Sequence, residues 1–277
     1  MSTKSVLIKT KKILLKQKAV LAILAMIVLM LFFDTQFFTV YNWLNIFRSV
    51  TVQGIIAMGV TMTVLCAACD LSVGGTMCLS GVIAVLMINF GVPIPIACLC
   101  ALLSGALVGA VNGFLVVHQR TEPFIITLGM GTLLKGISQL LTDAHPIACT
   151  NMSFMQIANT KILGQIPILI LYMLVIFLLF FWILRFTNYG RNCYAIGGNY
   201  EVAKYSGINT LAIKWSAFII SGAMAALAGI LLSSRMNSAS SVYGDNTGML
   251  VNCGVVIGGT SFAGGVGGAA ESFIGIF

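Results

Sequence analysis

Residues 166–208 read IPILILYMLVIFLLFFWILRFTNYGRNCYAIGGNYEVAKYSGI, an apolar run followed directly by a polar stretch. An α-helix needs about 20 apolar residues to cross about 30 Å of hydrocarbon, and residues 166–186 meet that length. The polar part, 190–208, interrupts a chain that is apolar on both sides of it. An ordered polar loop on one face of a membrane protein is a candidate contact surface, so the stretch predicts both a membrane-embedded fold and a functional surface.

The composition of the whole chain agrees with this interpretation. The sequence is 59% hydrophobic and 8% charged, with a mean hydropathy of +1.03, whereas soluble domains carry about 25% charged residues. We therefore expect an all-α polytopic membrane protein with about seven or eight transmembrane helices in a single domain, residues 1–277. The expected spans are 19–38, 50–68, 72–90, 93–117, 123–142, 166–186 and 215–234, with a weaker eighth at 249–257.

The basic residues are distributed unevenly between the two predicted membrane faces. The net charge is +8, and six lysines lie in the first 18 residues. Placing that end in the cytoplasm puts most other basic residues on the same side, as the positive-inside rule requires; these are Arg120, Arg185, Arg191, Lys204 and Lys214. The basic excess therefore indicates a cytoplasmic N-terminus in a cell (inner or plasma) membrane, and no nucleic-acid partner is expected.

No catalytic or metal-binding motif stands out. The eight cysteines show no disulfide spacing, and Cys66-x-x-Cys69 has neither a second pair nor a histidine beside it. Glycine pairs occur without the strand–turn–helix context of a nucleotide site. We expect no metal, no cofactor and no enzymatic activity in this chain, so any ATP is bound by another subunit.

Two ionisable residues stand inside apolar sequence. Charges at membrane depth are costly and usually face protein or water. For Asp70 the favoured interpretation is a cap that accepts backbone N–H groups of the following helix, and direct substrate contact is the alternative. For Lys135 the options are a structural ion pair with Asp70, snorkelling to an interface, or a role in transport.

A short helix is predicted within the polar loop 187–214. Residues 201–206 follow Asn199, a favourable N-cap, and precede Gly207, a favourable C′ residue. Glu201 in the first turn and Lys204 near the end match the helix dipole. The loops 143–165 and 235–248 are expected on the opposite face, the second as irregular chain.

Small residues recur at helix-packing spacing. Gly105, Gly109 and Gly113 repeat every four residues, and Gly222/Ala226 does the same in a later span. Packing within the chain is the favoured interpretation, and a subunit interface remains open.

Four motifs in order resemble one known family. They are Asp70-Leu71-Ser72-Val73-Gly74, the EPFI…TLG run at 122–129, the polar stretch 190–208, and VVIGGTS at 255–261. Over about 54–265 the sequence is similar to ABC-transporter permeases of the ribose/monosaccharide import class. The resemblance implies a second permease copy or homologue, separate cytoplasmic ATPase subunits, and an extracytoplasmic sugar-binding protein.

The resemblance also implies roles for the residues above. Residues 201–208 look like the segment that docks into the ATPase, with Glu201 as a charge contact and Ala203 and Gly207 allowing close approach. The pathway is expected between two permease copies, near 70–75. The intramembrane polar residues proposed there, as lining or as structural groups, are Asp70, Ser72, Asn112 and Lys135.

Two expectations qualify this interpretation. Relatives continue with at least one full span after residues 264–265, so we expect this chain to be C-terminally truncated, as a fragment or a frameshift product. The alternative function is a stand-alone ion-coupled secondary transporter, which needs paired broken helices; the sequence shows one candidate break, at 70–75.

Overall fold

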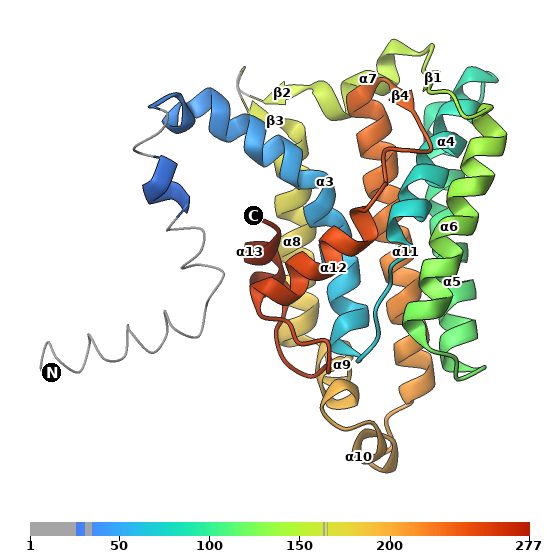
Figure 1. The fold of residues 1–277 in the computed structure, drawn as a ribbon, viewed down its shortest axis with the longest axis vertical. Helices are drawn as coiled ribbons and strands as arrows, with labels where there is room; N and C mark the ends of the chain where they lie inside the picture. The colour runs from blue at the N-terminus through green and yellow to red at the C-terminus, as the bar shows by residue number, and fades with distance from the viewer. Residues whose placement is uncertain (1–25, 31–34, 163, 165) are drawn as a thin grey trace, which may run out of the picture.

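The computed structural model describes residues 26–30, 35–162, 164 and 166–277 and is almost entirely helical (Figure 1). A short 3₁₀ helix, η1 (Thr35–Phe38), precedes the main bundle. The long helices are α3 (Val40–Leu65), α4 (Val73–Asn89), α5 (Ile94–Val117), α6 (Pro123–Thr142), α8 (Ile168–Phe186) and α11 (Thr210–Met236). The shorter ones are α7 (Met152–Asn159), α9 (Asn188–Gly198), α10 (Tyr200–Tyr205), α12 (Thr247–Gly258) and α13 (Ala269–Ile276).

Within the described residues, five helices are long and apolar enough to cross a membrane, namely α3, α5, α6, α8 and α11. The expected spans 72–90 and 249–257 form the shorter apolar helices α4 and α12. The all-α polytopic fold is confirmed. Most of the expected first span, 19–38, lies outside the described residues.

Two predicted span boundaries were wrong. The helix expected at 50–68 begins ten residues earlier, at Val40, and ends at Leu65. The helix expected at 215–234 begins at Thr210, so the polar loop expected to reach Lys214 ends before it. In both cases a helix continues through polar residues that an apolar window leaves out.

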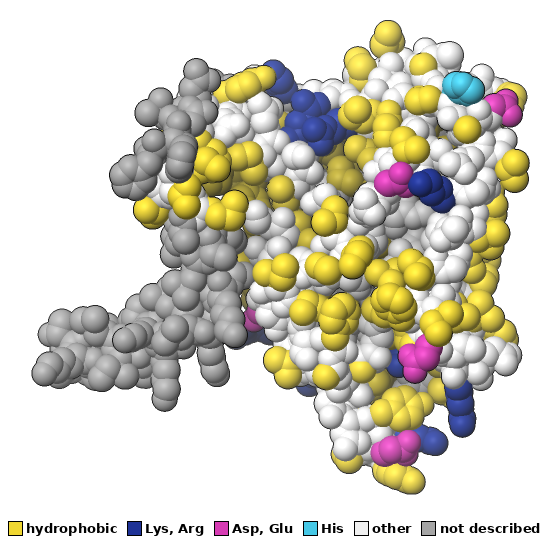
Figure 2. All heavy atoms as spheres, in the orientation of Figure 1, with side chains coloured by type: hydrophobic (Ala, Val, Ile, Leu, Met, Phe, Trp, Pro, Cys, Tyr) yellow, Lys and Arg dark blue, Asp and Glu magenta, His cyan; other side chains and the backbone are white. Residues whose placement is uncertain are grey.

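The core of the bundle consists of the second half of α3, most of α4 and the middle of α11. Helix α11 packs against α3, α4 and α5 together. The outer helices α5, α6 and α8 expose large apolar side chains, including Leu103, Leu107, Leu140 and Leu178. Because hydrocarbon solvates such side chains well, this surface is the one expected to face lipid. Figure 2 shows hydrophobic side chains over the middle of one face, with most charged ones towards its two ends.

The glycine repeats pack helices within the chain, as favoured from the sequence. A methyl group at Gly105 would lie 2.5 Å from the carbonyl oxygen of Gly222, and one at Gly113 would lie 2.6 Å from the Trp215 ring. Helices α5 and α11 are therefore in backbone contact along this face, which glycine alone permits.

The two ends of the bundle differ in structure (Figure 1). One end, the α10 end, carries α9 and α10. The other, the α7 end, carries α7 and two small antiparallel pairs, in which β1 (Ile147–Ala148) pairs with β4 (Ser238–Ala239) and β2 (Lys161–Ile162) with β3 (Ile166–Pro167). Part of the 235–248 segment, expected to be irregular throughout, is thus a short strand.

Candidate functional site

Two helices that start inside the bundle, α4 and α12, meet near their N-terminal ends. After α3 ends, residues 66–72 run from the α10 end up to the start of α4, and residues 240–246 run down from the α7 end to the start of α12 (Figure 1). The two starts touch, because a methyl group at Gly74 would lie 2.5 Å from the carbonyl oxygen of Gly244. The sequence predicted the first break and missed the second, which lay in a segment expected to remain at the surface.

A cavity of about 410 Å³ lies beside this junction. Its walls come from the first turns of α4 and α12, one side of α6 and the chain before α12. The lining residues are Leu71, Gly74, Gly75, Cys78, Phe124, Leu128, Gly131, Thr132, Lys135, Ser241, Gly244, Asp245, Asn246, Gly248 and Met249.

Asp70 is fully buried next to the first break. One carboxylate oxygen accepts hydrogen bonds from the Ser72 backbone N–H at 3.0 Å and the Ser72 hydroxyl at 2.6 Å, and the other accepts from the Ser221 hydroxyl at 2.7 Å. Asn112 donates to the Ser72 hydroxyl at 2.8 Å. Asp70 therefore accepts the N–H of Ser72, which is itself the residue before α4. Asp70 thus has the expected role of backbone acceptor, but the predicted N-cap assignment was wrong, because the N-cap of α4 is Ser72, two residues later.

The backbone of this break is held by side chains of other helices. The Leu71 N–H donates to Thr127 of α6 at 3.1 Å, and Asn252 of α12 donates to the carbonyl of Asp70 at 2.9 Å. Irregular chain at membrane depth persists only when its polar groups are satisfied in this way. The sequence identified Asp70, Ser72 and Asn112 but missed Thr127, Ser221 and Asn252, whose spacing along the chain gives no sign of their convergence.

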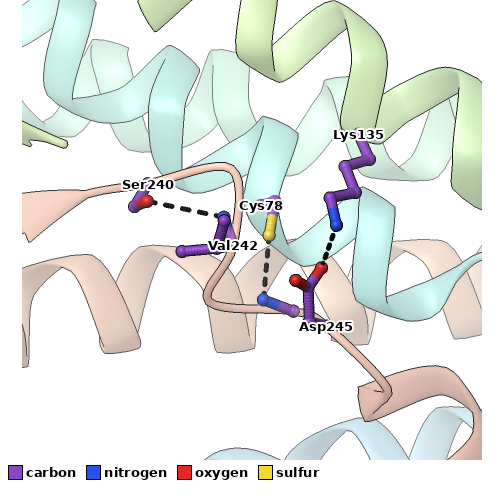
Figure 3. Close-up of polar contacts among 6 residues, drawn as sticks. Cys78, Lys135, Ser240, Val242 and Asp245 are labelled. Carbon is purple, nitrogen blue, oxygen red and sulfur yellow. Dashed lines mark hydrogen bonds and ion pairs between the residues drawn. The ribbon is translucent and has the colours of Figure 1, made fainter. Parts of the chain in front are cut away.

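Lys135 forms a structural ion pair, one of the options considered for it, but its partner is Asp245 and the candidate partner Asp70 was wrong. The Lys135 ammonium of α6 lies 2.6 Å from a carboxylate oxygen of Asp245, in the chain before α12, and the two side chains point toward each other (Figure 3). Their side chains are 38% and 44% exposed, at the cavity wall. Next to them, the Gly244 N–H donates to the Cys78 thiol sulfur at 3.0 Å. Asp245 was not identified from the sequence, because it lies 110 residues from its partner.

Helix α10 has the capping predicted for it. The Asn199 side chain accepts the Val202 N–H at 3.1 Å, and Gly207 has a φ of +82°. The N–H of Gly207 bonds the Lys204 carbonyl and that of Ile208 bonds the Ala203 carbonyl, which is a Schellman closure. Glu201 lies in the first turn and Lys204 in the last.

One expectation for α10 needs correction. Ala203, expected to let a partner approach, is 3% exposed and belongs to the chain's own core. It anchors the helix to the bundle. The apolar side chains that α10 exposes most are Val202 and Tyr205, at 60% and 86%, and neither was assigned a role from the sequence.

Helix α9 is fastened to the chain that follows α12. The Tyr194 hydroxyl donates to the Gly267 carbonyl at 2.8 Å, and the Gly265 N–H donates to the Leu65 carbonyl at the end of α3 at 3.0 Å. Gly197 packs directly on the backbone of Leu65 and Gly265, with no room for a methyl group. The α9–α10 unit, the end of α3 and the α12–α13 connection are thus in one continuous contact.

The Tyr194 hydroxyl of α9 has a raised pKa. Burial, and after it the nearby Glu271 carboxylate, raises the pKa of Tyr194 above its usual range. Its hydroxyl therefore remains a hydrogen-bond donor at any physiological pH. In the part of the chain that the structure describes, no three His, Cys, Asp or Glu side chains are placed to hold a metal ion.

Known transport permeases are similar to this chain over most of its length. Residues 42–274 match the family model described as branched-chain amino acid transport system / permease component. The ribose import permease protein RbsC of Haemophilus influenzae is 38% identical over 269 residues, which is 95% of this chain and 83% of the relative. The D-allose transport system permease protein AlsC of Escherichia coli K12 is 35% identical, over 83% of this chain and 71% of the relative.

A third relative, the autoinducer 2 import system permease protein LsrC of Salmonella typhi, is 33% identical over 94% of this chain and 74% of its own length. No solved structure matches the chain. The family model covers far more than half of the sequence, so the chain belongs to the family of transport-system permease components.

Proposed function

We propose that this chain is the membrane-spanning subunit of an ATP-driven importer for a sugar or a closely related hydroxyl-rich solute. Three permease relatives are named for the transport of ribose, D-allose and autoinducer 2. Their similarity extends over most of both chains. A solute-passing role also agrees with the cavity lined by the first turns of α4 and α12.

The observation that carries the proposal is the α10 helix. It is capped at both ends, anchored by Ala203, and presents Val202 and Tyr205 outward at the end of the bundle. A short rigid helix of this kind is suited to a groove on a soluble partner, here a cytoplasmic ATPase subunit. Glu201 and Lys204 add charged contacts, while Asn199 and Gly207 fix the helix ends.

The α10 end is accordingly the cytoplasmic side. Arg185 in the last turn of α8, Arg191 of α9 and Lys204 of α10 lie at that end, in agreement with the positive-inside rule. The N-terminus, with its six lysines, is proposed to be cytoplasmic as well. An extracytoplasmic binding protein would meet the α7 end. A second permease copy or homologue would face the cavity, with the chain in a cell (inner or plasma) membrane.

Within the pathway the polar residues divide into two groups. Asp70, Ser72 and Asn112 are buried in hydrogen bonds that hold the first break, so their role is structural. Lys135 lies at the cavity wall, where a passing solute would meet it.

Co-purification with the cognate ATPase tests the docking claim. Aromatic side chains at an interface often contribute about 2 kcal/mol or more, so Tyr205→Ala should weaken ATPase binding by about thirtyfold. Tyr41→Ala, 76% exposed near the start of α3 at the opposite end of the bundle, is the control and should bind as before. Equal retention of the ATPase by both variants would contradict the proposed docking.

A specific observation favours a second candidate, the stand-alone secondary transporter. Helices α4 and α12 both start inside the bundle after non-helical chain and meet there, which resembles the broken helices that such transporters use for ion and substrate sites. The family membership and the α10 helix favour the ATP-driven function over it. Ion-gradient-driven uptake by this chain alone in liposomes would reverse that preference.

A further inference from the structure

The cavity beside the first turns of α4 and α12 is lined by one ion pair and by otherwise uncharged residues. Lys135 and Asp245 are the lining residues that carry charge, and together they cancel. The remaining lining is apolar or neutral, including Thr132, Ser241 and Asn246. The volume of about 410 Å³ lies within the range of small-ligand sites, about 300–1,000 Å³.

The hydrogen-bonding groups of the cavity suit hydroxyl oxygens and hydrogens. The Lys135 ammonium has three donors and the Asp245 carboxylate has free acceptor positions beyond their mutual contact. The first turns of α4 and α12 also reach the cavity, and the N–H groups of a first helical turn have no partners within their own helix. Phe124 adds an apolar wall.

The cost of charge favours a neutral solute over a zwitterionic one. An amino acid would bring a carboxylate and an ammonium into the cavity and would have to separate Lys135 from Asp245 to pair with both. Because the Lys135 and Asp245 side chains are 38% and 44% exposed, a charge separated from its partner there is only partly solvated, which costs free energy relative to water. A neutral solute bearing neighbouring hydroxyls adds no charge and can bond both side chains while they remain close.

We propose that Lys135 and Asp245 are the solute-contacting pair of this cavity, and that their mutual neutralisation selects uncharged, hydroxyl-rich solutes over zwitterionic amino acids. The inference rests on the proposed function and assigns the substrate class and the selecting residues of its pathway. The description of the matched family names branched-chain amino acids, so amino acids and hydroxyl-rich solutes are the two substrate classes to be distinguished.

Transport by the full complex tests the role of the charges. The permease, its ATPase and its binding protein are reconstituted in liposomes, with D-ribose as the probe. Lys135→Gln and Asp245→Asn should each lower ATP-driven uptake by about tenfold or more, because each leaves one charge uncompensated. The double variant, neutral and still able to hydrogen-bond, should recover to within about threefold of the parent protein. Lys161→Gln, an exposed lysine at the α7 end outside the cavity lining, is the charge-matched control for the ribose-binding measurement described next; no binding protein is present there, and the variant should bind D-ribose as the parent does.

Solute contact is measured separately, with the permease–ATPase complex in nanodiscs and no binding protein. D-ribose should bind, L-leucine should not displace it, and Asp245→Asn should raise the Kd for D-ribose about tenfold, because it leaves the Lys135 ammonium without its charged partner at the solute site. In the uptake assay, the inference is overturned if the double variant is no more active than the single variants, or if all variants match the parent. In the binding assay, it is overturned if L-leucine displaces D-ribose or if the parent complex does not bind D-ribose. If the parent complex shows no ATP-dependent uptake at all, the proposed function fails as well, which separates the two results.

Discussion

The hydroxyl of Tyr194 donates a 2.8 Å hydrogen bond to the backbone carbonyl of Gly267, which ties α9 to the chain leaving α12. Helix α9 continues directly into α10, and α12 begins at the cavity. One connected set of elements thus runs from the proposed ATPase contact to the proposed solute site. Rigid elements in direct contact are a known means of transmitting domain motion.

Gly197→Ala should uncouple ATP hydrolysis from transport. Its new methyl group would overlap the backbone of Leu65 and Gly265 and force α9 away from them. Gly198→Ala is a matched control, because a methyl group there meets nothing within 4 Å. We expect at least about a tenfold fall in solute moved per ATP for Gly197→Ala, as for a misplaced functional element, and no change for Gly198→Ala. Equal coupling ratios in the two variants would contradict a transmitting role for this contact.

Asp70→Ala should destabilise the protein far more than Asp70→Asn. Alanine leaves the Ser72 N–H and two serine hydroxyls without their acceptor, at a cost of about 2–3 kcal/mol. Asparagine keeps one acceptor oxygen, and the Ser221 hydroxyl can accept from the amide instead, so a change within about 1 kcal/mol is expected. Thermal unfolding in detergent measures both.

The same pair of variants separates structure from ion coupling. If Asp70 holds the break only by hydrogen bonds, Asp70→Asn keeps ATP-driven uptake. A well-folded Asp70→Asn protein that has lost uptake would show that its charge is needed.

Gly75→Ala should damage the junction at the cavity. A methyl group there would lie 2.5 Å from the carbonyl oxygen of Gly131 in α6, and overpacking of this kind costs about 1–3 kcal/mol. Gly136→Ala, also in α6, meets nothing within 4 Å and should stabilise the helix by up to about 1 kcal/mol. Relative to the parent protein, Gly75→Ala should lower the melting temperature and Gly136→Ala should raise it. A shift of both variants in the same direction would argue against close contact of α4 and α6.

The anchoring of α9 should weaken at alkaline pH. Because the pKa of Tyr194 is raised in the folded protein, its contribution to stability is complete below the unfolded pKa of about 10 and is lost as pH rises above it. The difference in melting temperature between the parent protein and Tyr194→Phe should therefore shrink from about pH 9.5 upward. A difference that stays constant to pH 11 would contradict the raised pKa.

Local features of this molecule could be predicted from sequence and long-range ones could not. The caps of α10, Asn199 and Gly207, act within one helical turn, so the pattern alone placed them correctly. Asp70 was recognised because a lone carboxylate in apolar sequence needs partners. A lone charge in the sequence does not identify its partner. Ser221, which bonds Asp70, and Asp245, which pairs with Lys135, each lie more than 100 residues away along the chain.

Membrane depth was the second limit. The segment 235–248, RMNSASSVYGDNTG, has the composition of a surface loop, yet its later part runs into the bundle. Its polar groups are tolerated there because Cys78 and Lys135 bond them. Composition reports which residues need polar partners but does not say whether water or protein supplies them.

Uptake by purified components in liposomes tests the central claim most directly. The account predicts that D-ribose accumulates only when this chain, its ATPase and its binding protein are present together with ATP, and that Tyr205→Ala lowers the rate in proportion to its loss of ATPase binding. Accumulation by this chain alone, driven by an ion gradient and unaffected by Tyr205→Ala, would contradict it.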